Sequence, residues 1–352
     1  MSIYAEAVTQ DLLDSEMQVI ADLLDIDPDC ADSDGAMKDL VDQLAFRSKS
    51  LEIRNQIWNC SNCHLHKKCK KPVPFLGMEK RPEIVALGEA PGAEEDAANV
   101  GFVGRSGVLL RKSAEKVGIE IDDFINVCCC RPPDNREPTA NEINSCSPNL
   151  RDQIKHLDPW LVLTFGKTPL IAATMNKHLK VTRDHGIFFK TIWPSESSSL
   201  NHGGQARSIW GYSFYHPSYV LCALSGLKAI VDDDESRRRL KQNQETVQRW
   251  GQDWVFLAEI IKMRRLFKFS FESSFKDDLA DVSKWEPAFD KIMDETKQFN
   301  SYPPGDEKKF NSRSPANPVE WKGHPERTTY LQRMDAKIDF NMQDDDDWTI
   351  PF

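Results

Sequence analysis

Four of the nine cysteines in this chain form two widely separated pairs, and this spacing constrains the fold more than any other feature. The first pair is Cys60-x2-Cys63 and the second is Cys130-x15-Cys146. Thiolates gathered from distant parts of a chain are what a tetrahedral zinc ion or an iron-sulfur cluster requires. We therefore expect a metal centre that joins the segment around residue 60 to the segment 130–146.

Other side chains that bind metals lie close by in the sequence. Cys69, His64 and His66 are alternative ligands near the first pair. Cys128 and Cys129 fall in a predicted strand, whose side chains alternate between two faces, so neither is an obvious ligand. An odd number of cysteines, three of them adjacent, indicates a reduced compartment rather than a disulfide framework.

Glycine- and proline-rich loops are interleaved with these cysteines. Three stretches carry the pattern: GEAPGAEEDAANVGFVGRSGVLL at 88–110, NVCCCRPPDNREPTANEINSC at 126–146 and HPS at 216–218. With the cysteine spacing, they resemble the iron-sulfur uracil-DNA glycosylases, the family-four branch of that superfamily. The resemblance spans about residues 55–225 and reaches neither end of the chain.

Short apolar runs alternate with helical patterns from residue 82 onward. The runs expected to form strands are 82–90, 124–130, 160–166 and 211–218. Helices are expected at 106–118 and from the capping box Thr139-x-x-Glu142 to about His156. This order predicts a three-layer α/β/α domain with a mainly parallel four-stranded sheet, like that of the uracil-DNA glycosylases. Ligands of such sheets bind at the carboxyl ends of the strands.

Composition divides the chain into four segments. They are an acidic helical extension (1–50), a glycosylase-like domain with its iron-sulfur cluster (51–267), a charged and largely disordered linker (268–342) and an acidic docking tip (343–352). Apolar spacing over 8–45 predicts two short amphipathic helices. The Ser- and Gly-rich segment 181–210 is expected to be a flexible loop, and 234–267 the final helix of the domain.

The net charge of −10 argues against a DNA-binding protein until its distribution is considered. Residues 1–50 contain 12 acids and 3 bases, residues 51–230 contain 18 acids and 22 bases, and residues 231–352 contain 25 acids and 20 bases. The only basic segment is the one that carries the motifs. This is the distribution expected of a nucleic-acid-binding core with acidic extensions.

Nothing in the sequence indicates a membrane protein. No apolar run approaches the length needed to span a bilayer, and the N-terminal residues are acidic where a signal peptide would be basic. We expect a protein that does not act at a membrane and that is cytoplasmic or associated with the nucleoid.

The resemblance assigns three side chains to a base flipped out of the DNA. Phe102 would stack on the uracil ring, with a buried core ring as the alternative. The Asn126 amide would pair with uracil O4 and N3–H, a pattern that cytosine reverses. His216 would donate to uracil O2, where negative charge develops as the glycosidic bond breaks. Asn126 and His216 are therefore expected to act in catalysis and in substrate binding.

The first glycine loop carries the carboxylates of the site. Ala90 occupies the position where the best-known uracil glycosylases have a water-activating aspartate, and alanine cannot act as a base. Glu89 is the nearest carboxylate and becomes the candidate for orienting water. By the resemblance Glu95 would crowd uracil C5, where thymine carries a methyl group, and the alternative is an exposed acid in the run EED.

Several further residues suit contacts with the DNA backbone. Gly88 and the other loop glycines allow close approach of the main chain to phosphates, and Ser218 can donate to them. Arg131 and Arg136 suit phosphate contacts, or ion pairs within a loop fixed by prolines.

By the resemblance, the four paired cysteines, Cys60, Cys63, Cys130 and Cys146, would ligate a [4Fe-4S] cluster, although the residues alone also permit zinc. Its expected role is to hold separate segments together. One departure concerns the substrate pocket. The family's Gly-x-Pro before the stacking phenylalanine is replaced here by Asn99-Val100-Gly101.

The chain ends in QDDDDWTIPF, which resembles the C-terminal tip of bacterial single-stranded-DNA-binding proteins. There the tip is a docking peptide for replication and repair proteins, which predicts similar partners for Asp344–Phe352. A solubilising acidic tail is the alternative. The tip leaves a second function open beside excision of uracil: a replication accessory protein that uses the fold as a DNA-binding module.

Overall fold

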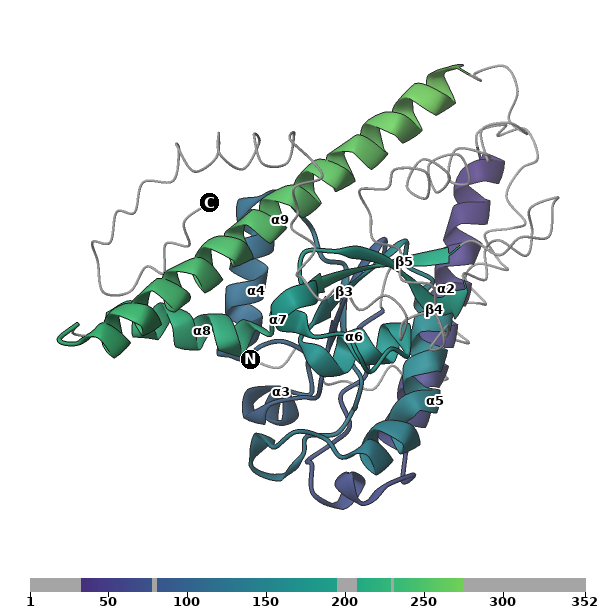
Figure 1. The fold of residues 1–352 in the computed structure, drawn as a ribbon. Helices are drawn as coiled ribbons and strands as arrows, with labels where there is room; N and C mark the ends of the chain where they lie inside the picture. Colours follow the sequence, from purple (N-terminus) through teal and green to yellow (C-terminus); the bar gives the residue numbers. More distant parts are fainter. Residues whose placement is uncertain (1–32, 78–80, 195–207, 229–230, 275–352) are drawn as a thin grey trace.

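The computed structural model describes residues 33–77, 81–194, 208–228 and 231–274, and a five-stranded sheet lies at its centre (Figure 1). The strands are β1 (Ile84–Gly88), β2 (Asp123–Asn126), β3 (Leu161–Phe165), β4 (Phe188–Pro194) and β5 (Ser208–Phe214). Their order is β2-β1-β3-β5-β4, with β4 antiparallel to β5 and the other pairs parallel.

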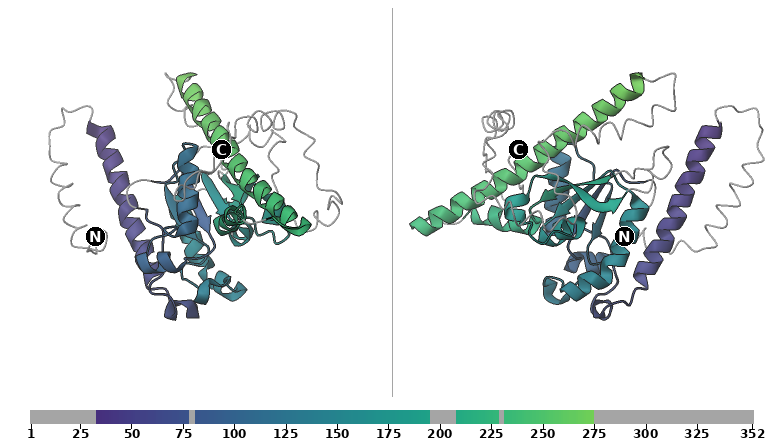
Figure 2. Two further views of the ribbon diagram at one scale, coloured as in Figure 1. Left: turned by 90° about the vertical axis from the view of Figure 1, so that its left-hand side faces the viewer. Right: turned by 45° about the vertical axis from the view of Figure 1, so that its right-hand side comes forward.

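Helices cover both faces of this sheet (Figures 1 and 2). One face is covered by α4 (Arg105–Lys116), α8 (Pro217–Gly226) and α9 (Asp234–Ser274), and the other by α2 (Ser33–Trp58), α5 (Ala140–Leu157) and α6 (Lys167–Thr174). Shorter helices are η1 (His64–Lys67), α3 (Ala93–Ala98), η2 (Pro133–Asn135) and α7 (Val181–Asp184). The predicted three-layer α/β/α fold is confirmed.

The parallel strands are buried on both faces, which explains their unbroken apolar runs. Alternation along β1 places Ala86 in the core beneath α4, α8 and α9, and Val85 and Leu87 in the core beneath α2 and α5. Helix α9 closes the first core with Trp250 and Trp254, both fully buried. The Trp254 ring packs 4.4 Å from the ring of Phe214. Truncating such a tryptophan typically costs about 3–5 kcal/mol.

The sheet has one strand more than the four that the sequence predicts. The additional strand, β4, lies within 181–210, which was expected to be a flexible loop. That expectation was wrong for residues 181–184 in α7, 188–194 in β4 and 208–210 in β5. Its apolar residues Phe188 and Phe189 belong to opposite cores, as in any strand covered on both faces. β4 pairs antiparallel with β5, and such a pair needs no crossover helix between its two strands.

The N-terminal extension is helical where the structure describes it. The second predicted helix is part of α2, which continues to Trp58 across the predicted boundary at residue 50. Neither glycine nor proline interrupts the sequence between residues 36 and 58, so nothing ends the helix earlier. The first predicted helix, the linker beyond residue 274 and the tip lie outside the described residues. Residues 268–274, predicted to begin a disordered linker, instead continue helix α9 to Ser274.

The strand order reverses between β1 and β3, because β2 follows on one side of β1 and β3 on the other. In doubly wound sheets, ligands bind beyond the carboxyl ends of the strands at this point. Gly88 ends β1, and Gly166 follows β3 there. Within the part of the chain that the structure describes, no helix has the length and apolar character needed to cross a membrane.

Candidate functional site

A cavity of about 320 Å³ opens at this carboxyl edge of the sheet. Its size falls in the range of small-molecule sites. All eight residues predicted to act in catalysis or to bind the substrate line it: Gly88, Glu89, Ala90, Glu95, Phe102, Asn126, His216 and Ser218. We call this space the active-site cavity. Residues more than 120 positions apart in sequence meet here because they follow β1, β2 and β5.

Gly88 makes room for the two groups at the base of the cavity. A Cβ atom at Gly88 would lie 2.4 Å from Asn126 Oδ1 and 2.6 Å from the Phe102 ring. No residue with a side chain fits there without displacing one of the two. Asn126, the last residue of β2, is buried yet faces the cavity, so its amide is held by the sheet.

Phe102 is both a core residue and a cavity residue. Its ring packs at 5.3 Å from Phe124 and 6.4 Å from Phe165, and it also lines the cavity. Its backbone φ is +58°, a strained conformation for a residue with a large side chain. Arg111 braces the loop by donating hydrogen bonds to the carbonyls of Phe102 and Gly101, both at 3.4 Å.

Two groups of Ser218, its hydroxyl at 2.5 Å and its main-chain N–H, contact Nδ1 of His216. The Ser218 N–H donates to His216 Nδ1 at 3.2 Å, and a main-chain N–H can only donate. Nδ1 is therefore an acceptor, and the proton of the neutral ring lies on Nε2. Burial lowers the pKa of His216, which also favours the neutral form. The imidazole that lines the cavity thus has an Nε2–H to donate.

Glu89 is half-buried and accepts a hydrogen bond of 2.5 Å from Thr168 Oγ1, at the start of α6. Burial raises the pKa of Glu89, and the Thr168 hydroxyl partly offsets this. This bond orients the carboxylate within the cavity. Ala90 also lines the cavity and contributes no polar side chain.

Glu95 is not the exposed acid that its sequence context allows. Its side chain is buried and accepts from the N–H of Gly92 at 3.0 Å and of Gly104 at 2.9 Å. These bonds tie the first turn of α3 to the start of α4. Because each carboxylate oxygen accepts a backbone N–H, Glu95 is fixed in the wall of the cavity.

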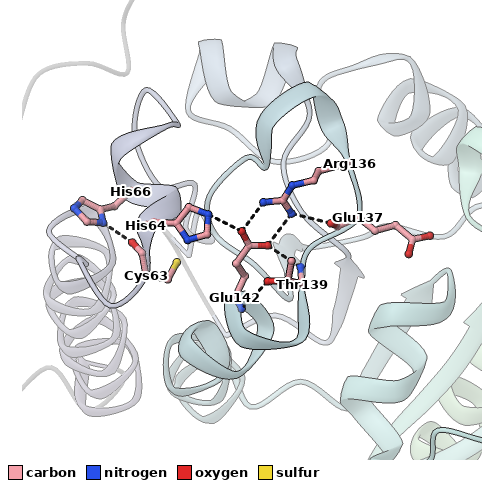
Figure 3. Close-up of polar contacts among 7 residues, drawn as sticks. All are labelled: Cys63, His64, His66, Arg136, Glu137, Thr139 and Glu142. Atoms are coloured by element: carbon pink, nitrogen blue, oxygen red, sulfur yellow. Dashed lines mark hydrogen bonds and ion pairs between the residues drawn. The ribbon is translucent and has the colours of Figure 1, made fainter.

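The arginines of the proline-rich loop differ in their surroundings. Arg136 forms two hydrogen bonds with Glu142, at 2.6 and 2.9 Å (Figure 3). It also lines the active-site cavity. The Arg131 guanidinium donates to Asn135 at 2.7 Å. Arg136 thus makes the ion pair expected within a fixed loop and also faces the cavity, whereas the partner of Arg131 is a neutral amide.

Glu142, on α5, connects the loop that precedes this helix with η1. Its carboxylate accepts from Arg136 and from the Thr139 N–H, and His64 Nε2 lies 3.1 Å from Oε1 (Figure 3). These bonds, led by that from Arg136, lower the pKa of Glu142 to about 2. His64 comes from η1, directly after Cys63, so the carboxylate joins the two segments that carry the cysteine pairs.

A second, narrow space lies beside Glu142, and we call it the cysteine cavity. Its sulfur-bearing lining residues are Cys60, Cys63, Cys128, Cys129, Cys130 and Cys146. The Asn149 amide donates to Cys60 Sγ at 3.4 Å, and the Cys129 N–H donates to Cys146 Sγ at 3.3 Å. All four predicted ligands thus face one space, and N–H groups point at two of the sulfurs, as at iron-sulfur sites.

Cys128 and Cys129 do not point to opposite faces. Strand β2 ends at Asn126, so strand alternation no longer applies to these residues, and both line the cysteine cavity. Contacts with both thiols lower the pKa of Cys146. Cys69 lies beside Cys130, whose contact lowers the pKa of the Cys69 thiol. Among the described residues, no three His, Cys, Asp or Glu side chains are gathered closely enough to hold a single metal ion.

Sequence reasoning missed three supporting residues. Thr168 and Arg111 lie in ordinary helical patterns, and only the fold brings them to Glu89 and to the Phe102 loop. Asn99, which replaces a family glycine, adopts the left-handed conformation with φ of +54° and accepts from Trp58 Nε1 at 3.0 Å. Asparagine adopts the left-handed conformation more readily than most residues, so an asparagine at a glycine position was the sequence feature that could have indicated this backbone conformation.

Comparison with known proteins agrees with this geometry. Residues 75–242 match the uracil DNA glycosylase superfamily. A type-4 uracil-DNA glycosylase of Archaeoglobus fulgidus is 39% identical over 172 residues, which is 48% of this chain and 82% of the relative. One from Thermotoga maritima is 33% identical over 193 residues, or 53% and 92% of the two chains. The chain therefore belongs to the type-4 uracil-DNA glycosylase family.

Proposed function

We propose that this protein is a uracil-DNA glycosylase, which hydrolyses the N-glycosidic bond of deoxyuridine in DNA and leaves an abasic site. The observation that carries the proposal is the neutral His216, whose Nε2–H shares one cavity with Asn126 and Phe102. A stacking ring, a pairing amide and a donor are the three groups that recognition of a flipped uracil needs.

The proposed reaction has three steps: recognition of the flipped uracil, breaking of the glycosidic bond with negative charge developing on the ring, and addition of water. Phe102 stacks on the flipped ring and Asn126 pairs with O4 and N3–H. As the bond from N1 to C1′ breaks, its electron pair moves onto the uracil ring, and the His216 donor stabilises the charge on O2. Water adds to C1′ and its proton passes in net to the uracil anion, so that abasic DNA and neutral uracil are the products. We propose that Glu89, held by Thr168, orients that water.

Excision of uracil from an oligonucleotide tests this directly. Wild-type protein should release uracil and leave an alkali-labile site, and the exposed substitution Asn144→Ala on α5 should behave as wild type. Asn126→Ala should lower single-turnover excision by about 10²-fold or more, because a preorganised polar contact is lost. No excision from single- or double-stranded substrates would contradict the proposal.

We also propose that the four paired cysteines hold a [4Fe-4S] cluster, with zinc as the alternative. The N–H···S bonds to Cys60 and Cys146 support a site for thiolate ligands. A bound cluster would supply cross-links between the segment after α2, the loop after β2 and helix α5. Anaerobically purified protein should contain iron and sulfide. Cys60→Ala should lose them, whereas Cys222→Ala, on the exposed surface of α8, should not. Stoichiometric zinc without iron would favour the alternative.

The C-terminal tip suggests a second role, which we propose as an addition to excision. Asp344–Phe352 combines four aspartates with a terminal Ile-Pro-Phe, which suits a docking peptide for replication or repair proteins. Deleting Trp348–Phe352 should abolish capture of such partners while excision persists. If wild-type protein binds DNA tightly and excises nothing, the protein is instead an accessory DNA-binding module. Cytoplasmic or nucleoid-associated localisation stays a prediction.

A further inference from the structure

A separate cavity of about 280 Å³ lies directly beside the active-site cavity. Its walls are mainly apolar, from Val103, Val108 and Leu221, while Arg105 and Lys112 add two positive charges and Glu94 one negative charge. Val103 and Val108 are 37% and 44% exposed, an unusual degree for two neighbouring valines. We call this space the flanking cavity. None of the residues predicted to hold the uracil lines it.

The two cavities share part of their wall. Arg105, Gly104 and Glu94 line both, so the boundary between them lies at the start of α4. The first N–H groups of a helix have no partner within the helix, and this end carries partial positive charge. A phosphate lying between the two cavities would meet Arg105 and these N–H groups.

We propose that the flanking cavity binds the nucleotide next to the uridine, with its base against Val108 and Leu221 and its phosphates near Arg105 and Lys112. This inference rests on the proposed function and extends it to the neighbouring residue of the DNA strand. A base must be unstacked to enter, so the occupant is a nucleotide of single-stranded or locally opened DNA. Glu94 at the boundary can accept from the exocyclic amino group of a base.

Continuity with the active-site cavity and the sign of the charge favour a nucleotide. Two adjacent cavities that share Arg105 in their common wall match a sugar-phosphate chain that places one base in each. The other candidate occupant is the acidic tip at 343–352 of this same chain. An apolar cavity with two cations would also suit such a peptide, so the experiment includes the truncated chain.

Binding to product-like DNA tests the proposal without requiring catalysis. We would use a single-stranded oligonucleotide with a tetrahydrofuran residue in place of the uridine, and replace the 5′ or the 3′ neighbour by a second tetrahydrofuran. Wild-type protein should lose affinity about fivefold or more on one side, since an apolar base contact is lost. The affinity for the oligonucleotide with the neighbouring base, divided by the affinity for the one without it, should fall to near one in Val108→Glu and in Leu221→Gln. Val231→Glu, at a similarly exposed valine, should keep the wild-type ratio.

The outcomes separate this inference from the proposed function. A ratio near one on both sides in wild-type protein overturns it, and so does an unchanged ratio in Val108→Glu. If Val108→Glu no longer changes the affinity ratio once residues 343–352 are deleted, the cavity holds the tip and the inference is wrong. An unchanged effect in the truncated chain supports it. Uracil excision is measured separately, so its absence would overturn only the proposed function.

Discussion

The active-site cavity and the cysteine cavity are built in contrasting ways. Strands fix the first: Asn126 ends β2, His216 follows β5, and Gly88 at the end of β1 leaves space for both the amide and the Phe102 ring. Loops and helix ends fix the second, in which the segment between α2 and η1, the loop after β2 and helix α5 supply the sulfurs. A site on strands is held by the core, whereas a site on loops depends on its own cross-links.

One ion pair connects the two cavities. Arg136 lines the active-site cavity, Glu142 lines the cysteine cavity, and their side chains meet at 2.6 Å. A substitution that disturbs the cysteine cavity can therefore displace Arg136 in the active-site cavity, through the proline-rich loop that carries it. The contrast predicts that substitutions in the active-site cavity change the rate with little change in stability, and that substitutions around Glu142 change stability first.

The largest expected effect is on the rate. His216→Ala removes the Nε2–H donor, which should lower single-turnover excision by about 10²- to 10³-fold, or about 3–4 kcal/mol of transition-state stabilisation. Affinity for undamaged DNA should stay within about twofold, because that binding rests on phosphate contacts. Chemical denaturation should show a loss of only about 1 kcal/mol, because the Ser218 N–H loses its acceptor at the start of α8. A large loss of stability would show that His216 supports the fold, and would contradict the expected difference between the active-site cavity and the surroundings of Glu142.

Glu142→Gln should have the next largest effect, this time on stability. Its side chain is 1% exposed and accepts charged and main-chain donors, so losing the charge should cost about 2 kcal/mol. The pKa of Glu142 is lowered to about 2, so its contribution is complete above pH 4.5 and is lost as the pH falls from 4.5 toward 2. Denaturation of wild type and variant at several pH values measures both effects. Glu137→Gln, an exposed neighbour, should match wild type.

A smaller effect is expected where α2 meets α5, the helices that flank the cysteine cavity. Ser50 Oγ lies 2.7 Å from His156 Nε2, and the His156 ring stacks on Phe46 at 4.5 Å. Burial, with the nearby cations of Arg81 and Lys49, lowers the pKa of His156 to about 4. The fold therefore holds the neutral ring. Its contribution is complete above pH 6.5 and is lost as the pH falls from 6.5 toward 4.

Ser50→Ala should lower the free energy of unfolding by about 1 kcal/mol at pH 7. His156→Gln cannot titrate, so the loss of stability between pH 6.5 and 4 should largely disappear in that variant. Unfolding by denaturant across this window measures the difference. An undiminished slope in His156→Gln would assign the acid sensitivity to other groups.

Sequence patterns predicted the parallel core of the fold because its strands are apolar and separated by helices. They missed β4, an edge strand inside a polar segment, and extended β2 to residue 130. That second error gave Cys128 and Cys129 the alternation of a strand, which their bent backbone does not have. Residues at strand ends could be proposed from their motifs. Thr168 and Arg111 could not, because no local pattern records a contact made across the fold.

The smallest expected effect concerns Glu89. Thr168→Val keeps the shape of the side chain and removes the hydroxyl that donates to Glu89 at 2.5 Å. That hydrogen bond lowers the pKa of Glu89 against the effect of burial, so its loss should raise this pKa further. If ionised Glu89 orients the water, the acidic limb of the pH–rate profile should move to higher pH. Excision should then fall about threefold at neutral pH, less than the typical worth of a general base.

The control is Thr182→Val, an exposed threonine outside the cavity, which should leave the profile unchanged. A profile that does not move in Thr168→Val, together with wild-type rates in Glu89→Gln, would exclude Glu89 as the group that orients water. In that case the cavity would act through His216 and Asn126, with the attacking water held by the substrate or by the main chain. The result therefore decides whether the Glu89 carboxylate takes part in the reaction or only lines the active-site cavity.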